Sequence, residues 1–287
     1  VYAVTSSGLS ISTDGGNTFI NKTRVNGLGT NAVNGVYAIG STVYAATSGG
    51  LSISTDGGAH FTNKTTANGL GSNIVQSVYA IGSNVYAGTG AGLSISTDGG
   101  ATFTNRITAN GLGNNDVRGV YAIGSAVYAA SYGGGLSIST DGGATFTNKT
   151  TANGLGSNYL QGVYAIGSTV YVATIGGLSI STDGGATFTN KTTTSGLGNN
   201  DLWGVYAIGS TVYAATNGGL SISTDGGATF TNKTTANGLG RDDVRSVFAI
   251  GSTVYAATPG GMSISADGGT IFSNTTMYTP NGPGLGY

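Results

Sequence analysis

The stretch Gly219-Leu-Ser-Ile-Ser-Thr-Asp-Gly-Gly-Ala-Thr-Phe230 decides the fold, because close copies of it occur seven times in the 287 residues. The aspartate of each copy marks the period, and successive aspartates are 42, 42, 43, 42, 42 and 42 residues apart. These aspartates are Asp14, Asp56, Asp98, Asp141, Asp183, Asp225 and Asp267. A fixed period of this length is typical of solenoids, propellers and arrays, so the sequence predicts one repeat domain.

Each repeat contains four short segments with the pattern of β-strands. In one copy, two apolar runs begin at Val205 and Thr211, and two alternating runs begin at Leu220 and Ala228. Glycine-rich turns separate the runs, and no 3.6-residue period is present. Four strands in about 42 residues are typical of one blade of a β-propeller. The sequence therefore predicts an all-β fold, a seven-bladed β-propeller of four-stranded antiparallel blades in residues 1–276.

We name the strands of a blade A to D from the innermost outwards. Strand A is apolar throughout, as in residues 36–39, so we expect it to be buried on both faces. It occurs six times, whereas strands B, C and D occur seven times, so blade 1 lacks its innermost strand and would have an open edge. Residues 277–287 form a tail with Pro280 and Pro283 that would fill this edge in cis, or in a second copy as a donor strand.

Two motifs resemble known propeller repeats. Ser12, Asp14, Gly16, Thr18 and Phe19 follow a pattern that resembles the Asp-box of BNR/sialidase-type propellers, although that family usually has Trp in place of the phenylalanine. The stretch from residue 68 to residue 93 is similar to two-component-regulator propeller repeats. Both resemblances imply a β-propeller, a fold that hosts many activities. In sialidase-like propellers the boxes lie away from the catalytic centre, so we interpret the seven aspartates as structural clamps of the turn between strands C and D.

The composition excludes several classes of protein. Charged residues make up 7% of the chain and the net charge is −1, so nothing favours binding to nucleic acid. Cysteine is absent, and no apolar run is long enough to insert into a membrane. No motif indicates a cofactor or a metal, and the single histidine, His60, is interpreted as a surface substitution. So uncharged a surface favours self-association, and we predict an extracellular or cell-surface protein, with the periplasm as the alternative.

The resemblance to sialidases raises the question of glycoside hydrolysis. Sialidases need an arginine cluster and a tyrosine that is activated by a glutamate, and this chain has no glutamate. Outside the repeat aspartates, the acids are Asp116, Asp201, Asp242 and Asp243. Asp242 and Asp243 are adjacent, so in a strand their side chains would diverge. The sequence therefore predicts that the chain is not an enzyme and has no catalytic residues.

The copies differ mainly in two links, D–A and B–C, which emerge at the same end of an up-and-down blade. The B–C link varies at Ser48, Gly90, Ala91, Tyr132, Ile175, Asn217 and Pro259. At the start of strand A, equivalent positions hold Asn34, Gln76, Arg118, Gln161, Trp203 and Arg245. We take these six residues, with Asp116, Tyr132, Tyr159, Asp201, Asp242 and Asp243, as candidate ligand-binding residues. The alternative is that these loops carry little information for the fold and vary by drift. Trp203 could be a stacking platform for a sugar or a planar ligand, or it could fill a gap near the axis.

Six Asn-x-Thr sequons also recur with the repeat. They are Asn21, Asn63, Asn148, Asn190, Asn232 and Asn274. They could be glycosylation acceptors on the outer rim, but simple copying of the repeat is the preferred interpretation.

The sequence thus leaves three functions open. The first is a non-enzymatic scaffold or interaction module that recognises a protein or glycan partner through the variable links. The second is a carbohydrate-binding propeller, lectin-like or related to glycosidases. The third is a self-assembling structural protein, as a homo-oligomer or fibre formed through the open edge of blade 1.

Overall fold

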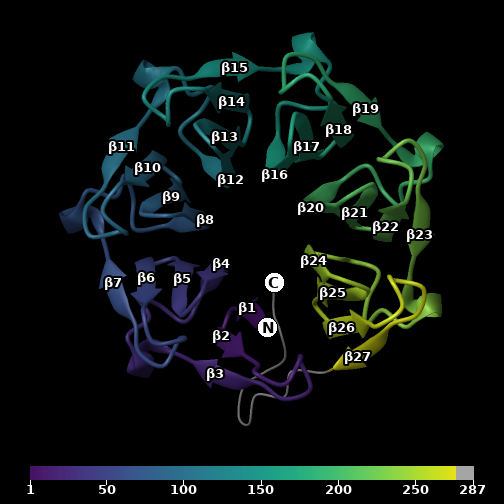
Figure 1. Cartoon of the computed structure of the whole chain (residues 1–287), viewed down its shortest axis with the longest axis horizontal. Helices are drawn as coiled ribbons and strands as arrows, with labels where there is room; N and C mark the ends of the chain where they lie inside the picture. The colour runs from purple at the N-terminus through teal and green to yellow at the C-terminus, as the bar shows by residue number, and fades with distance from the viewer. Residues whose placement is uncertain (276–287) are drawn as a thin grey trace. The chain divides into compact units, whose positions relative to one another are not determined.

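The computed structural model describes residues 1–275 and has the fold of a seven-bladed β-propeller, with one antiparallel sheet per blade (Figure 1). The first sheet has three strands and the other six have four, as the sequence predicts. The contacts divide the chain into two compact units, Val1–Asn148 and a second unit that begins at Lys149. The predicted role of the tail, residues 277–287, lies outside the described residues.

Unit 1 contains the first four blades. Their strands are β1 (Tyr2–Thr5), β2 (Gly8–Ile11) and β3 (Ile20–Lys22) in blade 1; β4 (Val33–Ile39), β5 (Thr42–Thr47), β6 (Gly50–Ser54) and β7 (Thr62–Lys64) in blade 2; β8 (Val75–Ile81), β9 (Asn84–Thr89), β10 (Gly92–Ser96) and β11 (Thr104–Arg106) in blade 3; β12 (Val117–Ile123), β13 (Ala126–Ser131), β14 (Gly135–Ser139) and β15 (Thr147–Lys149) in blade 4. Blade 1 has no strand A among the described residues, so β1 pairs only with β2.

Unit 2 contains the last three blades. Their strands are β16 (Leu160–Ile166), β17 (Thr169–Thr174), β18 (Gly177–Ser181) and β19 (Thr189–Lys191) in blade 5; β20 (Leu202–Ile208), β21 (Thr211–Thr216), β22 (Gly219–Ser223) and β23 (Thr231–Lys233) in blade 6; β24 (Ser246–Ile250), β25 (Thr253–Thr258), β26 (Gly261–Ser265) and β27 (Ser273–Thr275) in blade 7.

A short 3-10 turn follows strand D in each of the first six blades, and the strand patterns of the sequence do not reveal it. These turns are η1 (Arg24–Asn26), η2 (Thr66–Asn68), η3 (Thr108–Asn110), η4 (Thr151–Asn153), η5 (Thr193–Ser195) and η6 (Thr235–Asn237). In η2 the Thr65 hydroxyl accepts a hydrogen bond from the Ala67 amide, and Gly69 ends the turn with a φ of 93°. A side chain at Gly69 would collide with the Phe103 carbonyl of the next blade. The turn can therefore approach that blade closely only with glycine at this position.

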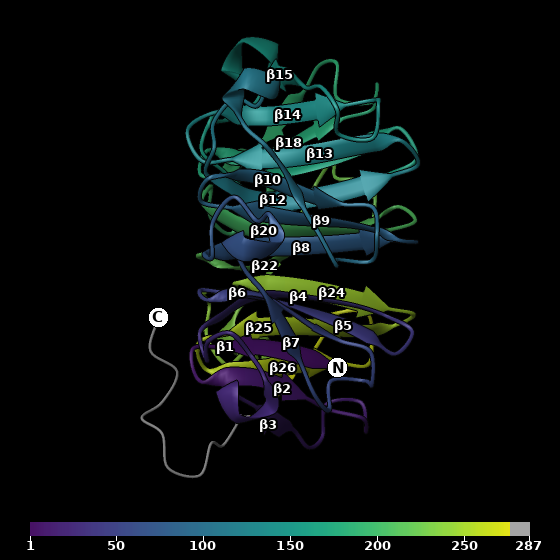
Figure 2. The same ribbon diagram turned by 90° about the vertical axis from the view of Figure 1, so that its left-hand side faces the viewer.

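Each blade has two distinct ends, which Figure 2 shows from the side. At one end, the Gly57 amide donates to the Ser41 carbonyl over 2.9 Å, which joins the C–D turn to the A–B turn. At the other end, the Ser48 amide donates to the Ala32 carbonyl over 3.1 Å, which joins the B–C link to the D–A link. We call the first the clamp end and the second the variable end.

The apolar core lies between neighbouring blades of a unit. Tyr44 and Leu51 of blade 2, for example, are buried with Val78 and Val85 of blade 3. Strands B and C supply most of the fully buried side chains, as in β9 and β10. Burial of these side chains stabilises the packing of one blade on the next by roughly 1.5–3 kcal/mol per large residue.

The expectation that strand A is buried on both faces is wrong. In β8 the side chains alternate between buried and partly exposed, and Ile81 is 37% exposed at the clamp end. Within each unit, the aromatic ring of one strand A packs on the ring of the next, with 4.7 Å between the centroids of Tyr37 and Tyr79. Strand A forms the inner edge of its sheet, so only those of its side chains that point toward a neighbouring blade are buried. Strand B lies between strands A and C, and nearly all of its side chains are buried.

Candidate functional site

The clamp end carries the repeat aspartates, and Asp141 shows their role. Its Oδ1 accepts hydrogen bonds from the Ser139 hydroxyl (2.6 Å) and from the amides of Ala144 and Thr145 (3.0 Å each), while Oδ2 accepts from the Thr145 hydroxyl (2.7 Å). The Ser139 oxygen in turn accepts from the Gly143 amide over 2.8 Å. The bonds from Ser139 and Thr145 hold the pKa of Asp141 well below its ordinary value. The carboxylate is thus engaged within its own turn between strands C and D.

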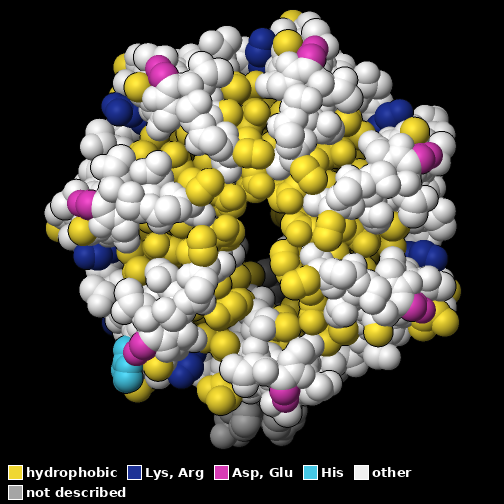
Figure 3. Space-filling view, in the orientation of Figure 1, with side chains coloured by type: hydrophobic (Ala, Val, Ile, Leu, Met, Phe, Trp, Pro, Cys, Tyr) yellow, Lys and Arg dark blue, Asp and Glu magenta, His cyan; other side chains and the backbone are white. Residues whose placement is uncertain are grey.

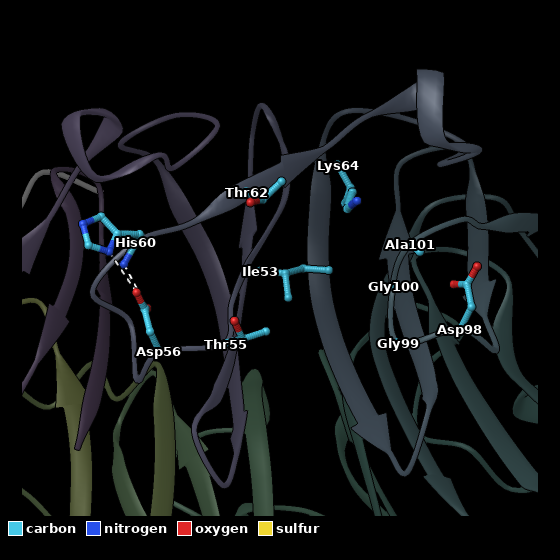
Figure 4. A pocket seen from close by; sticks show the side chains of 10 residues that line it. All are labelled: Ile53, Thr55, Asp56, His60, Thr62, Lys64, Asp98, Gly99, Gly100 and Ala101. Carbon is cyan, nitrogen blue, oxygen red and sulfur yellow. Dashed lines mark hydrogen bonds and ion pairs between the residues drawn. The ribbon is translucent and has the colours of Figure 1, made fainter.

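A shallow pocket of about 360 Å³ lies at the clamp end between blades 2 and 3 (Figure 4). His60 stands at its rim, 86% exposed, and its Nδ1 lies 2.8 Å from Oδ2 of Asp56. His60 therefore takes the bond that threonine makes in most other copies. Ile53 of β6, with Thr62 and Lys64 of β7, also lines the pocket, and the rest of the lining comes from turn residues. Figure 3 shows single acidic side chains spread around this face, one of them beside the histidine. The titratable residues of the pocket lining are Asp56, His60, Lys64 and Asp98.

The variable end holds the candidate ligand-binding residues, and in unit 1 four of them form a cluster. Arg118 donates to Oδ2 of Asp116 through Nε and Nη2, over 3.4 and 3.3 Å. Gln76 of the preceding blade donates to Oδ1 of the same aspartate over 3.4 Å. The guanidinium carbon of Arg118 lies 3.7 Å from the centroid of the Tyr132 ring, in the B–C link. The arginine is thus held by a carboxylate and by a cation–π contact, and one-third of its side chain is exposed.

A second cluster in unit 2 joins blades 6 and 7. The Trp203 indole Nε1 donates to Oδ1 of Asn217 (2.6 Å), and Nδ2 of Asn217 donates to Oδ2 of Asp201 (2.7 Å). The guanidinium carbon of Arg245 lies 4.0 Å from the centroid of the Trp203 ring, and Nη2 lies 2.5 Å from Oδ2 of Asp243. Five side chains therefore form a continuous chain of contacts across two blades. The sequence marks Asn217 only as a variable position, and nothing in the sequence indicates that it connects Trp203 to Asp201.

The electrostatics of the two clusters differ. In unit 1, one carboxylate faces one guanidinium, and both oxygens of Asp116 accept hydrogen bonds. In unit 2, two carboxylates face one guanidinium, and Oδ1 of Asp201 and Oδ1 of Asp243 are covered without a hydrogen-bond partner in the described structure. Burial raises the pKa of Asp201 above its ordinary value; the charge of Asp243 adds to this, and Arg245 opposes it.

The remaining candidate residues are Asn34, Tyr159, Gln161 and Asp242. Asn34 donates to the Val75 carbonyl over 2.8 Å, and Tyr159 is 45% exposed beside blade 5. Gln161 lies half-buried in β16. Asp242 accepts a hydrogen bond from the Thr235 amide over 2.7 Å, the bond that asparagine makes in the five preceding repeats. Asp242 is thus engaged in a local turn, while its role in ligand binding stays a prediction.

The asparagines of the sequons have a structural role. Asn190, for example, accepts from the Ser179 hydroxyl through Oδ1 (3.0 Å) and donates through Nδ2 to the Gly176 carbonyl (2.8 Å). Asn105 makes the same two bonds, although Arg106 and Ile107 follow it and no sequon is present. The asparagine therefore recurs because it joins strand D to strand C and to the B–C link.

Within residues 1–275, no group of three or more histidine, cysteine or acidic side chains could hold a metal ion. In the same residues, no helix has the length and hydrophobicity needed to cross a membrane.

Comparison with known proteins bears on the fold. No family model and no curated protein matches the chain. Among solved structures, the extracellular domain of the hybrid two-component system BT3049 from B. thetaiotaomicron has a TM-score of 0.69 at 18% identity, over 87% of this chain and 36% of that chain. An ancestral GH74 enzyme has a TM-score of 0.65 at 18% identity, over 84% of this chain and 37% of its own. YCF48 bound to D1 peptide has a TM-score of 0.63 at 15% identity, over 84% of this chain and 81% of that chain.

At these identities the likeness shows the propeller fold alone. The chain spans little more than a third of the BT3049 and GH74 chains. The likeness to BNR/sialidase-type and two-component-regulator repeats therefore stays a resemblance of motifs.

Proposed function

We propose that this chain is a non-enzymatic interaction module that binds a partner through the variable end of its blades. The observation that carries the proposal is the difference between the two ends. The clamp end repeats one set of hydrogen bonds in blade after blade, whereas the variable end holds two different clusters in which aromatic rings and carboxylates fix arginines. Arginine, tyrosine and tryptophan are the residues that most often anchor protein interfaces.

Three structures of the same fold support this proposal by analogy. YCF48 is described with a bound peptide, and the B. thetaiotaomicron domains are described as extracellular. We propose an extracellular or cell-surface location for this chain as well, with the periplasm as the alternative, because its surface is almost uncharged.

A carbohydrate is the second candidate ligand. The cluster of unit 2 combines an indole ring with carboxylates, an amide and a guanidinium, and a sugar could use all of these by stacking and hydrogen bonding. Against this, Arg245 covers one face of the Trp203 ring and Asn217 occupies its Nε1.

The test is a selection with a phage-displayed peptide library and, in parallel, a glycan array, both on the full chain. Ligands that are recovered should bind at least tenfold more weakly to the double variant Arg118→Ala/Arg245→Ala. They should bind unchanged to His60→Thr, a control that places the common residue of the repeat at the clamp end. If the affinity of the ligands changes only in His60→Thr, or in neither variant, the variable end is not the binding surface. If the glycan array gives ligands and the peptide library gives none, the second candidate, a carbohydrate, is favoured.

A further inference from the structure

The inner edge of β1 has no neighbouring strand within residues 1–275. Val1 and Ser12 exchange two backbone hydrogen bonds, of 2.7 and 2.8 Å, across β1 and β2. Bonded and non-bonded pairs alternate along an antiparallel ladder, so Tyr2 and Val4 direct their N–H and C=O groups away from β2. These two residues therefore offer a row of backbone donors and acceptors at the edge of blade 1.

In a complete blade, strand A lies at this edge. The equivalents in blade 2 are Tyr44 and Ala46, which pair with β4 and are buried. Tyr2 and Val4 themselves are only partly buried. In blade 7, the Ala257 carbonyl, at the place of the Val4 carbonyl, accepts a hydrogen bond from the residue before β24 over 2.8 Å. The groups left uncovered in β1 are thus those that bind strand A in other blades.

The neighbouring strand β4 shows which side chain would fill the remaining space. In blade 3, Val78 and Ala80 of β8 are buried, and Tyr37 of the preceding strand A packs against the core cluster that contains them. Val36 and Ala38 are the equivalents in β4, and both are partly exposed, since the described part of blade 1 has no strand A. An aromatic side chain in that strand position would cover them.

The six strands A of the chain define a segment that fits the edge of β1. They read Gly-Val-Tyr-Ala-Ile or Ser-Val-Tyr-Ala-Ile, with phenylalanine in place of tyrosine in blade 7. A Cβ on Gly35 would lie 3.2 Å from the Gln76 carbonyl oxygen, which favours a small residue at the first position. Residues 276–287 hold no copy of this pattern, and the strands A of a second copy already pair within their own blades. The segment that fits is therefore assigned to another protein.

We propose that the edge of β1 binds an extended segment of another protein as an added antiparallel strand. An aromatic side chain of this segment lies opposite Tyr2, a β-branched residue lies opposite Ala3, and glycine or serine lies opposite Val4. Backbone hydrogen bonds hold the segment, and the aromatic ring selects it. The inference goes beyond the proposed function, because this edge uses none of the side chains of the two arginine clusters.

The probe is the peptide fluorescein-Gly-Val-Tyr-Ala-Ile-Gly-Ser-amide, titrated with the full chain while its anisotropy is measured. A saturable rise is expected, and alanine in place of the tyrosine should weaken binding at least tenfold. N-methylation of the tyrosine amide, which would bond to Tyr2, should weaken binding as much. N-methylation of the valine amide, which faces away from β1, should be tolerated. An unsaturable response, or equal effects of the two N-methyl groups, would overturn the proposal.

Val4→Pro should weaken the peptide at least tenfold, because it removes an edge donor that β2 does not use. Ile20→Thr is the control: Ile20 is exposed on β3, at the opposite edge of the same sheet, and most other blades have threonine there. It should leave the affinity unchanged, and full affinity in Val4→Pro would refute the site. Circular dichroism confirms that each variant is folded; if Val4→Pro is not, the two N-methyl peptides decide on the unaltered chain.

Two further measurements identify the source of the segment. The proposal predicts that a peptide of residues 276–287 does not displace the probe, and that the chain forms no oligomer that the probe dissociates. Displacement would identify the tail as the occupant, and dissociation would identify a second copy, so either result contradicts the assignment to another protein. The variant Arg118→Ala/Arg245→Ala should bind the probe with unchanged affinity, which separates failure of this edge from failure of the variable end.

Discussion

Replacing Asn190 by alanine should destabilise the chain, because this asparagine completes a relay of hydrogen bonds. The Gly156 amide donates to the Ser179 hydroxyl (2.9 Å), this hydroxyl donates to Oδ1 of Asn190, and Nδ2 of Asn190 donates to the Gly176 carbonyl. Ser179 is fully buried. In Asn190→Ala its hydroxyl proton has no acceptor, and the Gly176 carbonyl loses its donor.

The expected loss follows from these two groups. A buried hydroxyl without an acceptor costs about 1–2 kcal/mol. The bond to Gly176, which lies partly exposed and can turn to water, contributes about 1 kcal/mol. The free energy of unfolding should therefore fall by about 2–3 kcal/mol. At about 2 °C per kcal/mol for a chain of this size, the melting temperature should fall by about 4–6 °C.

Thermal and urea unfolding, followed by far-UV circular dichroism, measure the effect. Thr189→Ala is the control, because Thr189 is the exposed neighbour in the same strand and should change the stability by less than about 0.5 kcal/mol. The double variant Ser179→Ala/Asn190→Ala should lose less than the sum of the two single variants, because both remove the same bond. If Asn190→Ala is as stable as Thr189→Ala, the asparagine does not hold the blade together and the sequons need another explanation.

The remaining predictions concern the clamp end. Asp141→Ala should lower the melting temperature without changing ligand affinity at the variable end; lost affinity at unchanged stability would contradict the structural role of the clamp. The clamp aspartates have pKa values below their ordinary value in the folded chain, so their contribution is complete above the unfolded pKa of about 3.9 and is lost as the pH falls through and below it. Melting temperatures measured by circular dichroism should therefore fall steeply below about pH 4, and a flat profile would contradict this account.

The sequence predicts the blades well because their signals are local. The period of the aspartates gives the number of blades, and the alternation in each run gives four strands. The position of Asp141 in the C–D turn follows from Asp-Gly-Gly alone, since both glycines take positive φ (75° and 93°). Burial of strand A could not be predicted in the same way, because an apolar run does not show which strand lies at the inner edge of the sheet.

The candidate site could be predicted only as a set of positions. The alignment of repeats brings Trp203 and Arg245 to equivalent places in neighbouring blades, and the structure brings them into contact. Asn217 connects Trp203 to Asp201 only because the B–C link reaches the start of strand A. Side-chain directions in a link have no regular repeat along the sequence, so this contact could not be predicted. The unpaired oxygens of Asp201 and Asp243 depend on rotamers, which no sequence pattern specifies.

Backbone bonding explains why the variable end can vary. In blades 2–6, the amide of the first link residue donates to a carbonyl just before strand A, as in Tyr132 to Asp116 and Asn217 to Asp201. Any residue except proline can make this backbone bond. The side chain at this position of the B–C link can therefore differ from blade to blade while the hydrogen bond to the D–A link is kept. Pro259 marks the limit in blade 7: it has no amide proton, and strand A starts later there, at Ser246. The clamp end depends instead on the side chains of serine, aspartate and threonine, so it tolerates few changes. Variation alone is therefore no sign of function, and the contacts through five side chains from Asp201 to Asp243 are what the proposed binding role rests on.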